Sequence, residues 1–133
     1  MNDELQTRTR QQLELLDRFC QAWNAHDVEA LLTMVTPDCV YDGSTGPALH
    51  GVRFQGHEEL RRGFAGVWEA IPDARWEEAR HVACGGDRAF TEWVFRGKRL
   101  SDGSKVDSQG VDLFQFRDGL IAYKNTFRKM VTA

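Results

Sequence analysis

Residues 106–129, VDSQGVDLFQFRDGLIAYKNTFRK, decide the fold class of this chain. Apolar and aromatic residues recur at two-residue intervals on both sides of Asp118-Gly119, and this period is typical of β-strands. Asp-Gly is also a strong signal for a tight turn between antiparallel strands. The stretch therefore predicts a β-hairpin with strands at 106–117 and 120–129.

The same period of two extends toward the N-terminus over residues 74–84 and 88–100, with short glycine-containing turns between the segments. Four antiparallel strands in a meander are therefore predicted. Before Pro72 the apolar period is that of a helix, over residues 7–25, 28–35 and 57–71. Asp27 is expected to cap the second of these helices and Pro37 to end it. Residues 39–42 form a short strand in this prediction, and residues 51–56 are extended.

Helices followed by a run of strands indicate an α+β fold with the helices packed on one face of the sheet. The chain has 133 residues, 41% of them hydrophobic, and no linker-like tract divides it. We therefore predict a single domain over residues 1–133.

Composition and charge exclude several classes of protein. The net charge of −3 disfavours binding to the phosphates of a nucleic acid, and no apolar run is long enough to span a bilayer. The three cysteines, Cys20, Cys39 and Cys84, are odd in number and widely spaced, which favours reduced thiols and a cytoplasmic location. We expect no nucleic-acid partner and no membrane association.

Apolar groups lie on both faces of the predicted strands. One face carries Phe90 and Val94, Val111 and Leu113, and Tyr123 and Phe127. Such a patch is too large to be left in water, so we expect a symmetric homodimer through this outer face of the sheet.

Asp112 shares the other face with Phe114 and Phe116. A carboxylate among aromatic rings must be paired, protonated or open to a cavity, because burying an isolated charge is too costly. The four histidines are not spaced as metal ligands, and no cysteine completes such a set. We therefore expect neither a metal site nor a cofactor.

Four stretches together carry a resemblance to a known family: FCQAWNAHDVEALLTMVTPDCVYDG, FQGHEELRRGF, IPDARW and DLFQFRDGLIAYKNTFRK. In this order and spacing they resemble the nuclear transport factor 2-like superfamily, on its SnoaL-like and ketosteroid-isomerase-like side. The resemblance implies a cone: a curved antiparallel sheet around about three N-terminal helices, of the cystatin-like α+β roll type. It also implies a pocket at the wide end and a dimer through the outer sheet face.

The resemblance places two carboxylates at positions of interest. Asp42 falls where ketosteroid isomerase keeps its proton-shuttling carboxylate, and Asp112 falls where that enzyme keeps a hydrogen-bonding carboxylic acid. Phe19 stands where the isomerase has a tyrosine. Thr126 stands where related cyclases and epoxide hydrolases have an aspartate, with Lys124 and Arg128 on the same face of the strand.

The leading functional hypothesis is a SnoaL-like enzyme that acts by proton transfer on a small apolar carbonyl compound. Its predicted catalytic residues are Asp42 and Asp112, and its predicted substrate-binding residues are Phe19, Trp23, Trp93, Phe114, Lys124, Thr126 and Arg128. The alternatives are a non-catalytic small-molecule-binding module and a dimerisation domain whose cone is filled by side chains. In those readings, Asp42 and Asp112 form ion pairs with Lys124 and Arg128.

Overall fold

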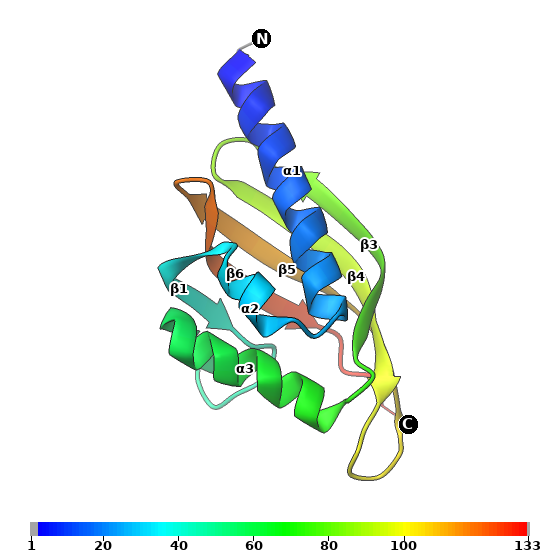
Figure 1. Ribbon diagram of the computed structural model, residues 1–133. Helices are drawn as coiled ribbons and strands as arrows, with labels where there is room; N and C mark the ends of the chain where they lie inside the picture. Colours follow the sequence, from blue (N-terminus) through cyan, green and yellow to red (C-terminus); the bar gives the residue numbers. More distant parts are fainter. Residues whose placement is uncertain (1–2, 133) are drawn as a thin grey trace.

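The computed structural model describes residues 3–132 as three helices and one curved six-stranded sheet (Figure 1). In chain order these are α1 (Asp3–Asn24), α2 (Val28–Leu32), β1 (Val35–Asp42), β2 (Arg53–Gln55), α3 (Gly56–Ala70), β3 (Arg75–Ala83), β4 (Arg88–Lys98), β5 (Lys105–Arg117) and β6 (Leu120–Arg128). The helices lie on one face of the sheet, with α1 running across it. The predicted α+β cone is confirmed.

The strand order is β2-β1-β6-β5-β4-β3, and the predicted meander of β3 to β6 is antiparallel throughout. The sheet as a whole is mixed, because β1 pairs with β6 in parallel. The sequence predicts only antiparallel pairing. Hairpin turns fix the direction of neighbouring strands, whereas no local turn signal joins two strands so far apart in the chain.

The region from α2 to β1 differs from the sequence prediction. Asp27 caps α2 as predicted, accepting a hydrogen bond from the backbone N–H of Ala30 at 3.1 Å. However, α2 ends at Leu32, and Pro37 lies inside β1 rather than ending a helix. Proline is tolerated there because the β1–β6 register shifts between Val35 and Val40, so the ladder does not need its missing N–H.

A bulge in β6 decides which of its side chains face the helices. Phe116 pairs with Ile121 and Gln115 pairs with Tyr123, so Ala122 is an extra residue between two regular pairs. As a result, both Ile121 and Lys124 are buried, although a regular strand would point them to opposite faces.

Stacked aromatic rings form the part of the core that reaches the open end of the cone. Trp23 of α1 stacks on Trp76 of β3 with ring centroids 4.1 Å apart, and Trp76 stacks on Trp93 of β4 at 5.7 Å. Large rings of this kind bury much apolar area and fix one another's orientation. They form a rigid wall from which a cavity extends.

The cysteines within residues 3–132 are free, with Cys20 and Cys39 buried and Cys84 exposed. Burial raises the pKa of Cys20 to about 11 and that of Cys39 to about 12, so both remain protonated packing groups at neutral pH. No helix among the described residues is both long enough and apolar enough to cross a membrane.

Candidate functional site

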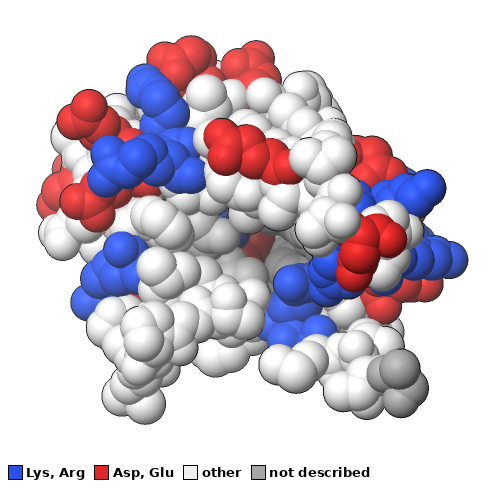
Figure 2. Space-filling view, turned by 90° about the horizontal axis from the view of Figure 1, so that it is seen from below, with Lys and Arg blue, Asp and Glu red and all other residues white. Residues whose placement is uncertain are grey.

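A cavity of about 350 Å³ opens at the end of the cone where α3 and the last residues of β6 lie. Figure 2 looks at this end and shows a hollow with mostly uncharged walls and lysine or arginine atoms along one side. The apolar lining includes Trp23, Tyr41, Phe54, Val67, Ile71, Trp76, Trp93 and Phe95. The cations in the lining are Arg62, Lys124 and Arg128, and no described acidic residue lines it.

Asp112 lies immediately behind the cavity wall and is fully buried. Its Oδ2 accepts a hydrogen bond from the Trp93 indole N–H at 3.0 Å, and its Oδ1 accepts one from the Thr126 hydroxyl at 2.5 Å. The Lys124 ammonium is 3.1 Å from the same Oδ1 and donates to the Thr126 hydroxyl at 2.9 Å. Because every neighbour is a donor, an ionised carboxylate satisfies the whole network.

Lys124 links this network to the cavity. Its side chain is only 3% exposed, yet it belongs to the cavity lining. The ammonium lies 4.3 Å from the centre of the Tyr41 ring and 5.3 Å from that of Trp76, both within the range of cation–π attraction. Burial raises the pKa of the Tyr41 hydroxyl, so it remains protonated at neutral pH. Lys124 is thus a charged donor held at an aromatic wall.

Gly110 allows Trp93 to reach Asp112. The two residues are directly opposite on β4 and β5, and the indole lies over the glycine. A Cβ atom at Gly110 would be 2.4 Å from the indole ring and 2.7 Å from the carbonyl oxygen of Phe127. Only glycine leaves room for the ring that donates to Asp112.

Asp42 lies on the other side of the sheet from the cavity. Arg53 of β2 donates to both of its carboxylate oxygens, at 2.8 and 2.9 Å, and the Tyr123 hydroxyl also donates to it. None of these three residues lines the cavity. The hydrogen bonds from Arg53 hold the pKa of Asp42 below its ordinary value, against the opposing effect of burial.

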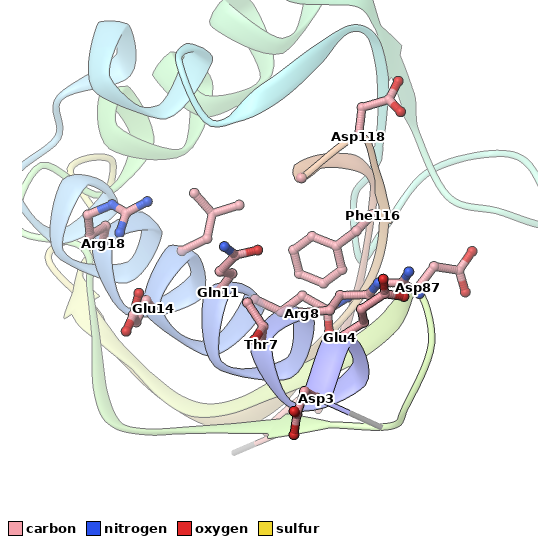
Figure 3. Close-up of a pocket in the computed structure, with 13 residues that line it drawn as sticks. Asp3, Glu4, Thr7, Arg8, Gln11, Glu14, Arg18, Asp87, Phe116 and Asp118 are labelled. Carbon is pink, nitrogen blue, oxygen red and sulfur yellow. The ribbon is translucent and has the colours of Figure 1, made fainter. Parts of the chain in front are cut away.

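A second, larger hollow of about 900 Å³ lies between the first half of α1 and the β5–β6 turn (Figure 3). Charged residues of both signs surround it, including Glu4, Arg8 and Arg18, whereas its apolar lining is limited to Leu15 and Phe116. Such a surface offers little to an apolar ligand, so we place the candidate site in the aromatic cavity. Residues 3–132 contain no group of three or more potential metal ligands.

The SnoaL-like domain family matches residues 16–124, which is most of the chain. The chain belongs to this family. No curated protein matches the SnoaL-like chain.

Solved structures share the fold of this SnoaL-like domain. A candidate polyketide cyclase from Xanthomonas campestris pv. campestris has a TM-score of 0.80 and 19% identity, over 90% of this chain and 91% of its own. A candidate SnoaL-like polyketide cyclase from Jannaschia sp. CCS1 has a TM-score of 0.78 and 19% identity, over 91% and 87%. A phenazine biosynthesis-related protein from Pseudomonas aeruginosa has a TM-score of 0.76 and 14% identity, over 96% and 84%. At these identities the likeness establishes the fold.

The SnoaL-like cavity brings together most of the predicted binding residues. Trp23, Trp93, Lys124, Thr126 and Arg128 all line it. The other two predicted binding residues, Phe19 and Phe114, lie outside the lining and contact each other in the core, with ring centroids 5.9 Å apart.

The sequence analysis missed Tyr41, Trp76, Phe95 and Arg62 as lining residues. Phe95 could have been found, because it is two residues from Trp93 on the same strand and therefore shares its face. Arg62 is exposed, and no pattern in its helix distinguishes it from Arg61.

The two predicted catalytic carboxylates do not face one cavity. Tyr41 points into the cavity, so the next residue of the strand, Asp42, points to the opposite side. The alternative of two ion pairs is correct for Asp112 with Lys124, whereas the partner of Asp42 is Arg53, which the sequence analysis did not single out.

The pairing of Asp42 with Arg53 predicts a specific dependence of stability on pH. Because the folded pKa is lowered, the stabilisation is complete above the unfolded pKa of about 4 and is lost as the pH falls through the folded pKa. Thermal melts should show Asp42→Asn less stable than wild type by a constant margin from pH 7 to pH 5. This difference in stability should shrink below about pH 4, and a difference independent of pH would contradict the ion pair. Glu69→Gln, at an exposed position, is the control.

Proposed function

We propose that this SnoaL-like chain is an isomerase- or cyclase-type enzyme that acts by proton transfer on a small apolar carbonyl compound. The observation that carries the proposal is a buried ammonium, Lys124, which lines an aromatic cavity and is held by Asp112. A donor fixed in a site of low polarity stabilises the negative charge that develops on a carbonyl oxygen during enolisation.

In the proposed step, the Lys124 ammonium first donates a proton to the carbonyl oxygen. The resulting amine then removes a proton from the carbon next to the carbonyl, so Lys124 returns to the ammonium form and the ketone becomes its enol. Asp112 touches no substrate in this scheme. It positions Lys124, and Thr126 supports the same geometry.

Hydrogen exchange at carbon tests the proposal without knowledge of the natural substrate. The probe is 2-tetralone, an apolar bicyclic ketone with enolisable protons, dissolved in D₂O with the protein. Wild type should accelerate loss of the α-proton NMR signals in a saturable manner, by about 10²-fold or more over buffer. The double variant Asp112→Asn/Lys124→Met should lose the acceleration while keeping its fold by circular dichroism. Equal exchange rates for the two proteins would contradict the role of Lys124.

The second candidate function is binding without turnover. The observation that favours it is the absence of acidic residues from the described cavity lining, together with the position of Asp42 across the sheet. In this case 2-tetralone should quench the fluorescence of Trp23, Trp76 and Trp93 saturably and leave the exchange rate at that of buffer.

We also propose that the chain forms a homodimer through the outer face of the sheet. Leu113 and Phe127 on this face are 44% and 54% exposed, and Phe90, Val94 and Val111 beside them are partly exposed. Leu113→Lys places a charge within this apolar surface and should give a monomer by sedimentation at micromolar concentration. Leu100→Lys, in the β4–β5 turn, is the control that should remain dimeric; a monomeric wild type would refute the proposal.

A further inference from the structure

Arg128 is a partly buried cation at the cavity that lacks a carboxylate partner among the described residues. Its guanidinium lies 4.8 Å from the centre of the Phe95 ring and donates one hydrogen bond, to the Ser108 hydroxyl at 3.3 Å. A guanidinium has five N–H groups, so most of its hydrogen-bonding capacity is left for another acceptor.

The other buried charges at this end of the sheet are all compensated. Lys124 is paired with Asp112, and Asp42 is paired with Arg53. Arg128 instead has a second cation, Arg99, near it. Burial and Arg99 both lower the pKa of Arg128, although it stays protonated at neutral pH. An anion at this position would relieve both unfavourable effects.

The position of Arg128 indicates how such an anion would arrive. Arg128 lines the aromatic cavity and also an adjoining hollow of about 350 Å³. The charged residues of this hollow besides Arg128 are Arg99, Lys105, Lys129 and one acid, Asp107, which is paired with Arg96. Ser44 and Thr45 are common to both linings. The Phe95 ring packs against the Arg128 guanidinium. The N–H groups of the guanidinium can then bind a carboxylate through two parallel hydrogen bonds.

We propose that the ligand of this cavity is a planar apolar carboxylate, whose rings fill the aromatic part and whose carboxylate binds Arg128. This inference deepens the proposed function and rests on the cavity being its ligand site. Lys124 then faces the ring system, and the carboxylate sets which carbon of the ligand lies beside it. Arg62, the third cation of the lining, is exposed and adds to the positive potential that attracts the anion.

Two probes that differ in charge test this inference: 2-naphthoate, which carries a carboxylate, and 2-naphthamide, its neutral counterpart. Binding is measured by quenching of the cavity tryptophans and by calorimetry. Wild type should bind 2-naphthoate at least about tenfold more tightly than 2-naphthamide, as expected for hydrogen bonds to a charged group. Arg128→Gln should remove this preference and leave the affinity for 2-naphthamide unchanged.

Two further variants complete the test. Arg128→Lys keeps the charge without the fork and should retain part of the preference, whereas Arg61→Gln, a surface arginine paired with Glu29, should retain all of it. A preference that survives Arg128→Gln, or equal binding of both probes to wild type, overturns the inference and leaves the cavity as a site for neutral ketones. Binding of neither probe overturns the inference and the ligand site of the proposed function together.

Discussion

Lys124→Met lowers the free energy of unfolding by about 3–5 kcal/mol, because it leaves the Asp112 carboxylate buried without its cation. Asp112→Asn has a cost of similar size, since it leaves the Lys124 ammonium among aromatic rings without its carboxylate partner. The double variant Asp112→Asn/Lys124→Met should lose much less than the sum of the two, because it removes both charges together.

Urea unfolding of the four proteins measures this cycle. The expected coupling between the two positions is at least about 2 kcal/mol, well above the range of an exposed salt bridge. Arg61→Gln, which breaks an exposed ion pair with Glu29, is the matched control and should change stability by less than about 1 kcal/mol. Additive losses would show that Lys124 and Asp112 do not depend on each other for burial.

Gly110→Ala is expected to lower the free energy of unfolding by about 3 kcal/mol. The new methyl group would meet the Trp93 ring on one side and the backbone oxygen of Phe127 on the other. A backbone atom cannot move aside, so the indole must leave its place and its hydrogen bond to Asp112 is lost.

Thermal melting and tryptophan fluorescence together check this expectation, because a displaced indole changes emission as well as stability. Gly66→Ala is the control: this glycine lies in the exposed part of α3 with open space where its Cβ would be. Alanine favours a helix over glycine, so Gly66→Ala should gain about 0.5–1 kcal/mol. If Gly110→Ala melts like wild type, Trp93 is not held by close packing.

Local patterns predicted most of the fold. The period of two and the Asp118-Gly119 turn identified β3 to β6 within one or two residues, because antiparallel hairpins are encoded by neighbouring residues. The parallel contact of β1 with β6 was missed for the converse reason. This pairing joins segments that are far apart in the chain, and the sequence of neither segment indicates whether the two strands run parallel or antiparallel.

The candidate site was predicted less well, and the reasons lie in single residues. The family resemblance placed Asp42 at a cavity, but strand alternation gives that place to Tyr41 and gives Asp42 to the opposite face. Lys124 lies at the cavity as predicted, whereas the bulge at Ala122, which places Ile121 on the same buried face as Lys124, was not predicted. A bulge of one residue leaves no clear mark in the sequence.

The strand order has a consequence for how the chain is made. β6 is the last strand to be synthesised, yet it lies inside the sheet, between β1 and β5. Until residues 120–128 leave the ribosome, β1 and β5 each present an unpaired edge, and such edges are prone to pair with other chains. The sheet therefore cannot be completed before β6 emerges, and a chain that lacks these residues is left with two open edges and without Lys124 and Arg128 in its cavity.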